Sequence, residues 1–297
     1  MIINRKIPIK FFFNEIKVPL LTVTLLGLAF GIAPKYFPDF TPDIPIGIAT
    51  TLGIAISILL SYKINQSYNR WWEARTIWGA IVNDSRSLVL QLQLYLNEDD
   101  ALLHKISHYQ IAWCYALDKS LRKQDIFKSL EHLLSNEDLE KVKTQSNIPL
   151  ALNQLQTKAV RTLYKNGRFD EFARTQLEET LTRLVASMGK CERIKNTVFP
   201  PTYGQTLNIA IYLFVIFLSL SSVLELNLLL QIIILTSISM VFFFLQKLAH
   251  QLQDPFDNHP TDTPMTALSR TIEINIRQLL NEKDIPNPME PNKFYLN

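Results

Sequence analysis

The feature that most constrains the fold is the stretch from Ile44 to Trp78, which passes from apolar to charged residues without an obvious break. Its first part, Ile44 to Tyr62, contains 19 residues and no formal charge. At about 1.5 Å per residue, a helix of that length crosses the ~30 Å hydrocarbon core of a bilayer. From Lys63 onward the chain is charged and aromatic, and no proline or glycine marks the transition. This pattern predicts one rigid helix that leaves the membrane and continues into water.

Three other apolar runs have the length of a membrane crossing. The sequence predicts transmembrane helices at about 18–36, 43–63, 203–224 and 226–247. Glu225 separates the last two runs, which predicts a tight external turn between them. Lysine and arginine precede the first crossing and follow the second, so the positive-inside rule places both termini in the cytoplasm. We therefore expect a multi-pass protein of the cell (inner) membrane.

The rest of the chain predicts a cytosolic helical region, at about 64–200 and 248–297. Apolar residues recur there every three to four positions, as in Ile106, Tyr109, Trp113 and Leu117. Helix breaks are expected near 97–100, 147–149 and 166–167, and an amphipathic helix is expected near 265–280. The two cysteines, Cys114 and Cys191, fall in this region and are expected to be free thiols. The predicted fold class is an all-α membrane protein.

One stretch of this chain is similar to a known family. Residues 65–79, NQSYNRWWEARTIWG, resemble a motif of the bestrophin family of ion channels. Asp254-Pro255-Phe256, after the last apolar run, resembles a second bestrophin element. The likeness extends over roughly residues 1–285 and is greatest to the prokaryotic branch. It implies a single bestrophin-like domain over 1–297 and a homopentamer around a central pore, although nothing in the periodicity shows five subunits.

A stripe of three residues on the second crossing is the first candidate site. Ile54, Ile58 and Tyr62 recur at every fourth position, so they share one face of a helix. Taken alone, such a stripe is typical of packing against neighbouring helices. The bestrophin resemblance implies instead that these residues line a hydrophobic pore neck. Rings of apolar side chains gate ion flow by excluding water, and the hydroxyl of Tyr62 would leave the inner end wetter.

Two further positions have alternative interpretations. The resemblance places Phe172 at a cytosolic aperture, a ring of one apolar residue per subunit, whereas the alternative is simple packing in a helical bundle. Arg70 and Glu73 are i,i+3 neighbours on the predicted helix and could form a local ion pair. We interpret this pair as architectural, connecting the membrane layer to the cytosolic layer.

The charge of the predicted outer loops bears on ion selectivity. Asp39, Asp43 and Glu225 outnumber Lys35, so each subunit would contribute net negative charge to the outer mouth. Such a field concentrates cations and repels anions, within the screening length of salt. This balance favours conduction of monovalent cations. The bestrophin family contains both anion and cation channels, so chloride conduction is the close alternative.

Metal sites have little support in the sequence. His104 and His108 have the i,i+4 spacing of zinc ligands, but no glutamate follows the first histidine and no third ligand is evident. Animal bestrophins hold calcium with an acidic cluster at the position of residues 254–262. Asp254, Asp257 and Asp262 could supply oxygen ligands there, yet His259 stands where an acid would be wanted. We expect no cofactor and doubt a role for calcium.

Several classes of function are disfavoured. A net charge of +3 and the lack of a recognisable module argue against nucleic-acid binding. No Walker loop or nucleophile elbow indicates an enzyme, and the four crossings lack the ionisable residues of a coupled transporter. The expected partners are membrane lipid, monovalent ions and further copies of the chain. The alternatives are a non-conducting scaffold or sensor that binds partners through its cytosolic helices and, as a third reading, a metalloenzyme using His104 and His108.

Overall fold

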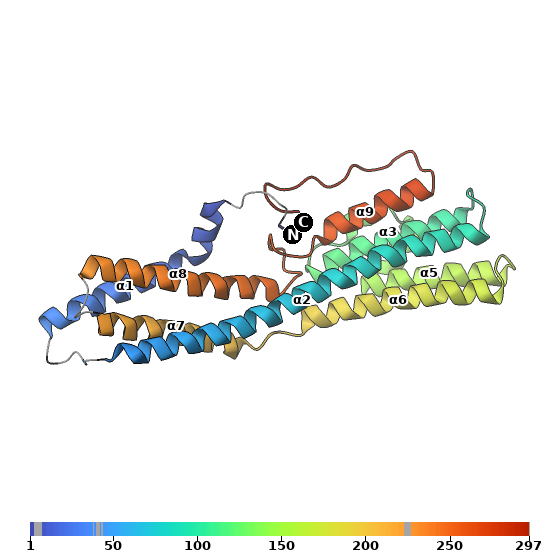
Figure 1. Cartoon of the computed structure of the whole chain (residues 1–297). Helices are drawn as coiled ribbons and strands as arrows, with labels where there is room; N and C mark the ends of the chain where they lie inside the picture. Colours follow the sequence, from blue (N-terminus) through green and yellow to red (C-terminus); the bar gives the residue numbers. More distant parts are fainter. Residues whose placement is uncertain (3–7, 38, 40–41, 43, 223–226, 297) are drawn as a thin grey trace. The chain divides into compact units, whose positions relative to one another are not determined.

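The computed structural model describes residues 1–2, 8–37, 39, 42, 44–222 and 227–296. Within those residues the regular elements are helices, with only isolated bridges besides, which confirms the all-α prediction (Figure 1). The helices are α1 (Ile9–Tyr36), α2 (Ile46–Tyr95), α3 (Ala101–Leu121), the 3-10 turn η2 (Phe127–Ser129), α4 (Asn136–Lys143), α5 (Ile148–Lys165), α6 (Glu171–Asn196), α7 (Pro201–Ser222), α8 (Leu228–Gln253) and α9 (Met265–Leu279).

Four of the described helices are long and apolar enough to cross a membrane, as the sequence predicts. They contain the spans Phe13–Ala33, Ile46–Tyr95, Pro201–Ser221 and Leu228–Gln253. Helix α2 runs for 50 residues without interruption, so the prediction that the helix continues past Lys63 is confirmed. Helices α1 and α8 extend beyond the apolar segments. Charged residues such as lysine and glutamate favour helical backbone about as well as apolar residues do, so a helix need not end where the apolar run ends. Glu225 lies outside the described residues.

The backbone divides into two compact units. The membrane unit comprises Arg5–Arg70 and Val198–Gln253, and the bundle unit comprises Met1–Asn4, Trp71–Thr197 and Asp254–Asn297. In the membrane unit, α1 packs along α8 and α7 (Figure 1). A Cβ at Gly27 would lie 2.8 Å from a methyl carbon of Leu235. Small residues of this kind allow two membrane helices to approach closely, which is how α1 and α8 pack.

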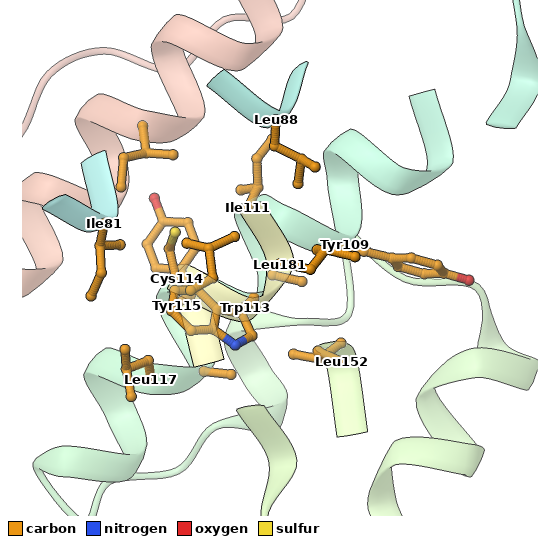
Figure 2. Packing of buried hydrophobic residues seen from close by; sticks show 14 of the residues in the cluster. Ile81, Leu88, Tyr109, Ile111, Trp113, Cys114, Tyr115, Leu117, Leu152 and Leu181 are labelled. Carbon is orange, nitrogen blue, oxygen red and sulfur yellow. The ribbon is translucent and has the colours of Figure 1, made fainter. Parts of the chain in front are cut away.

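The bundle unit has a large apolar core centred on α3. Figure 2 shows Trp113 among side chains of its neighbours, including Ile81 and Leu88 of α2, Leu152 of α5 and Leu181 of α6. All five side chains are buried. The residues predicted to repeat on one face of this segment (Ile106, Tyr109, Trp113 and Leu117) are buried as well. The three-to-four periodicity thus predicted the helix correctly, but residues 109–118 are buried on every side of it, so α3 is a central helix of the bundle and not an amphipathic one.

The predicted helix boundaries in the bundle unit follow from capping residues. The side chains of Asp100, Asn147 and Asp170 accept hydrogen bonds from the first turns of α3, α5 and α6. Gly167 follows the end of α5 with φ of +69°, a conformation that glycine adopts without steric cost. These contacts satisfy backbone groups that a helix end leaves unpaired, and they confirm the three predicted breaks.

Both cysteines are free and buried, as expected. Burial raises the pKa of the Cys114 thiol and of the Cys191 thiol to about 12. At neutral pH both groups are therefore protonated and poor nucleophiles.

A buried carboxylate joins α3 to α4. Asp138 accepts a hydrogen bond of 2.7 Å from the Tyr109 hydroxyl, and the Lys105 ammonium lies 2.9 Å from the same carboxylate. Burial alone would raise the pKa of Asp138, but the hydrogen bonds from Tyr109, Lys105 and Ser135 more than offset it and hold the pKa at about 2. Because the folded-state pKa is lowered, this group stabilises the fold above its ordinary pKa of about 3.9, and that contribution is lost as the pH falls toward about 2.

We expect Asp138→Asn to lower the free energy of unfolding by on the order of 1–2 kcal/mol at pH 7. The difference from the unmodified protein should shrink below about pH 4, where the carboxylate begins to be protonated. Chemical denaturation followed by tryptophan fluorescence at the two pH values measures this. Glu137→Gln is the matched control, because both partners of its ion pair with Lys141 are exposed and the solvent screens their attraction. Equal stability of Asp138→Asn and the unmodified protein at pH 7 would contradict the assignment.

Candidate functional site

One face of α2 in the membrane unit exposes a run of large apolar side chains. Ile54, Ile58 and Tyr62 are 58%, 65% and 56% exposed on the single chain. Ile56 and Leu60, on another face of the same helix, are fully buried against α7 and its neighbours. Four residues advance a helix by about 40° beyond one full turn, so the three exposed residues form a continuous stripe. The stripe is separate from the packed core.

Polar residues border this stripe at both ends. On the side toward the start of α2, the Thr51 hydroxyl donates to the carbonyl of Gly47 at 2.8 Å, within the helix. Beyond Tyr62, the exposed amides of Asn65 and Asn69 are hydrogen-bonded to each other at 3.1 Å. The exposed face is therefore apolar along the stripe and polar at each end of it. Sequence analysis missed the asparagine pair. Asn65 and Asn69 lie on the same face of the helix as Tyr62, about one and two turns further along.

The inner end of the stripe is held by an aromatic contact with α7. The rings of Tyr62 and Tyr203 lie 6.3 Å apart between centroids. The Tyr203 hydroxyl donates a 2.8 Å hydrogen bond to the backbone carbonyl of Leu59, which anchors α7 to α2 at this level. The Tyr62 side chain nevertheless remains more than half exposed. It is positioned by its neighbour without being enclosed.

Phe172 in the bundle unit is also exposed. It is the second residue of α6, directly after the turn capped by Asp170, whose carboxylate accepts a 2.7 Å hydrogen bond from the backbone N–H of Ala173. Its side chain is 85% exposed, whereas Ala173 and Leu177 are fully buried. Phe172 thus does not belong to the buried core of a single chain.

The polar residues of the bestrophin-like motif have distant partners. The Arg70 guanidinium donates to the backbone carbonyl of Gln253 at 2.8 Å. Glu73 forms an ion pair with Arg193 of α6, where sequence analysis had paired it with Arg70. The Trp71 indole donates to the carbonyl of Thr261 at 2.8 Å. These contacts join segments far apart in the sequence, so local spacing could not have revealed them.

The predicted outer-mouth charges are only partly described. Asp39 is exposed. Asp43 and Glu225 lie outside the described residues, so the structure does not place the negative ring that favoured cations.

The two histidines of α3 share an acidic neighbour that sequence analysis did not find. His108 Nε2 lies 2.7 Å and His104 Nδ1 lies 3.5 Å from the carboxylate of Glu282. Arg277 binds the other oxygen of that carboxylate at 2.7 Å. Although burial opposes it, the nearby histidine and arginine charges lower the pKa of Glu282. Arg277 and the histidines therefore contact different oxygens of Glu282, and no metal-binding group of three His, Cys, Asp or Glu residues occurs among the described residues.

Two of the three calcium candidates are paired with a lysine. The Lys195 ammonium lies 2.9 Å from the Asp254 carboxylate and 3.2 Å from that of Asp257. Asp262 is buried, and burial raises its pKa to about 6, so it holds a negative charge less readily than an ordinary aspartate. Lys195 already pairs with two of the three candidates and offsets one of their two negative charges. These residues fit a structural ion-pair cluster better than a calcium site.

Comparison with known proteins agrees with this architecture. A family model described as "Bacterial/Fungal Bestrophin protein" matches residues 12–278. The voltage-dependent anion channel-forming protein YneE of Escherichia coli is 31% identical over 272 residues, covering 92% of this chain and 84% of the relative. A voltage-dependent anion channel-forming protein of Nostoc is 28% identical over 230 residues, covering 76% of this chain and 75% of the relative.

A solved structure is similar over nearly the same length. The crystal structure of a bacterial bestrophin homologue from Klebsiella pneumoniae superposes with a TM-score of 0.86 at 28% identity. It covers 91% of this chain and 100% of the solved chain. The four apolar helices, the motif at residues 65–79 and the match of the family model over most of the sequence agree with one another. The chain belongs to the bestrophin family of membrane proteins, in its bacterial and fungal branch.

Proposed function

We propose that this chain is a passive ion channel of the cell (inner) membrane that assembles as a homopentamer and conducts monovalent ions, anions in preference to cations. The observation that carries the proposal is the exposed apolar stripe of α2 between two polar ends. A single chain leaves Ile54, Ile58 and Tyr62 uncovered. Copies of α2 around an axis would bring the stripes together as a narrow passage that excludes water.

The preference for anions replaces the cation preference derived from the outer loops. The bacterial relatives are named as anion channel-forming proteins. A neck made of Ile54, Ile58 and Tyr62 carries no formal charge and cannot itself select by sign. Ions must shed water to pass such a neck, and the cost of dehydration falls as ionic radius rises, which favours chloride over sodium.

Other parts of the proposal follow from the same assembly. Phe172 would form the cytosolic aperture, and its exposed position at the start of α6 supports this role. Asp39, Asp43 and Glu225 would lie at the outer mouth. The two units would work as a single functional domain, with both termini in the cytoplasm.

Reversal potentials of the purified protein in planar bilayers test the proposal. With a gradient of potassium chloride, we expect the reversal potential to move toward the chloride equilibrium potential. Movement toward the potassium potential would contradict anion preference and restore the cation alternative. If neither the unmodified protein nor Ile58→Ala conducted any current, the channel assignment itself would fail and the scaffold alternative would take its place.

A further inference from the structure

The membrane unit contains a cavity that the proposed pore does not use. It has a volume of about 540 Å³ and lies where the start of α1, the start of α7, the end of α8 and the middle of α2 meet. Polar residues from these helices face it, including Glu15, Lys63, Gln246, Lys247 and His250. Apolar residues from Val198 to Pro201 form another part of its wall. A cavity with one charged side and one apolar side suits an amphiphilic ligand.

Lys63 is the residue that defines the chemistry of this cavity. The residue is only 3% exposed, yet its ammonium makes no ion pair or hydrogen bond with any residue in the described part of the chain. The space beside the ammonium is open because position 204 is glycine: a Cβ there would lie 3.5 Å from Lys63 Nζ. The ammonium faces the cavity without a protein partner, so an anion bound there would supply the counter-charge that the protein does not provide.

The other charges of the cavity do not supply that anion. Among the described residues that line the cavity, Glu15 is the only acid, and its carboxylate lies 3.2 Å from the Lys247 ammonium. That pair neutralises itself and leaves Lys63 uncompensated. Gln246 and His250 also line the cavity. The amide nitrogen of Gln246 donates to the carbonyl of Gly204 at 3.3 Å and carries a second hydrogen that it can donate. The set of donors matches a phosphate group, which presents several acceptor oxygens.

The level of the cavity in the membrane identifies the source of the phosphate. Lys63 ends one predicted crossing and Lys247 ends another, so the cavity lies at the predicted cytoplasmic interface. Lipid headgroups are found at this depth, and the cytoplasmic leaflet is rich in anionic lipids. We propose that this cavity binds the phosphodiester headgroup of an anionic phospholipid, with Lys63 as its counter-ion and the apolar wall from Val198 to Pro201 beside the acyl chains. This lipid site rests on the proposed membrane location of the protein, but it does not depend on the protein conducting ions.

Native mass spectrometry of the detergent-solubilised assembly, titrated with phosphatidylglycerol or phosphatidylcholine, tests this site. We expect the unmodified protein to retain phosphatidylglycerol in preference to phosphatidylcholine, and Lys63→Met to weaken its retention about tenfold, the usual effect of losing one charge-assisted hydrogen bond. Lys63→Arg should restore binding. Lys17→Met is the matched control, because Lys17 is an exposed lysine of α1 that does not line the cavity.

A second variant covers the case in which Lys63→Met does not assemble. Gly204→Leu keeps the charge but fills the space beside Lys63, so it should weaken phosphatidylglycerol retention by a similar factor. Equal losses in Lys63→Met and Lys17→Met, or no preference for phosphatidylglycerol in the unmodified protein, would overturn the proposal. Displacement of the lipid by millimolar inorganic phosphate would overturn the assignment to lipid and indicate a site for free phosphate.

Discussion

Truncation of Ile58 to alanine is expected to raise the conductance of the reconstituted protein about fivefold, as follows from lowering the barrier by about 1 kcal/mol. The Ile58 side chain is the most exposed of the stripe and lies at its centre. If five copies face one axis, each truncation removes apolar volume from the narrowest part and lets water enter. The barrier for ions falls because less hydration is lost on passage. Single-channel recording in planar bilayers measures the change.

Ile56→Ala is the matched control for this variant. Ile56 stands two residues away on the same helix and is fully buried in the membrane unit. Its truncation leaves a cavity and should cost roughly 2–5 kcal/mol of stability without widening any passage. We therefore expect less assembled protein and an unchanged unitary conductance. If Ile56→Ala increased the unitary conductance, or if Ile58→Ala did not increase it, the stripe would not line the pathway.

Charge introduced at Phe172 is expected to change ion selectivity by about tenfold in the permeability ratio of chloride to potassium. Phe172→Arg should raise that ratio and Phe172→Glu should lower it, because a ring of like charges concentrates the opposite ion at a constriction. The side chain is 85% exposed, so neither change places a charge in the core of the bundle. Reversal potentials under the same potassium chloride gradient measure both effects.

The opposite signs of the two Phe172 variants separate a pore position from a general loss of structure. Leu150, at the start of α5, is another exposed apolar residue of the bundle unit. Leu150→Arg and Leu150→Glu should leave the permeability ratio unchanged. If Phe172→Arg and Phe172→Glu behaved like the Leu150 pair, Phe172 would not be part of the pathway.

Much of the fold could be predicted from the sequence because its signals are local. The length of α2 follows from an apolar run that continues into a charged segment without proline or glycine. The caps at Asp100, Asn147 and Asp170 depend on side chains that bond to the backbone two or three residues away. The helical conformation of α3 follows from periodicity, although its burial on every side over residues 109–118 does not. Each of these features is determined within one or two turns of helix.

The pairings that could not be predicted join residues far apart in the chain. Glu73 has Arg193 as its partner, and the two histidines of α3 share Glu282. Spacing within one helix carries no information on such contacts. The local Arg70–Glu73 pair was therefore a reasonable expectation from i,i+3 geometry, but tertiary packing gave Glu73 a different partner.

For the candidate site, the sequence predicted which residues share one helix face, but it did not predict what surrounds them. A period of four identified Ile54, Ile58 and Tyr62 as one face, and the structure leaves that face exposed. The cavity beside Lys63 was not predicted, because its walls come from four helices and its openness depends on Gly204. Selectivity was the least predictable property, since it depends on how charges from several chains are arranged around the passage.

A structure of the assembled protein in a lipid nanodisc, determined by electron cryomicroscopy, tests the central claim most directly. We predict five chains around one axis, with the side chains of Ile54, Ile58 and Tyr62 of every chain pointing at that axis where the passage is narrowest. A structure in which these three side chains face the acyl chains of the surrounding lipid would contradict the account.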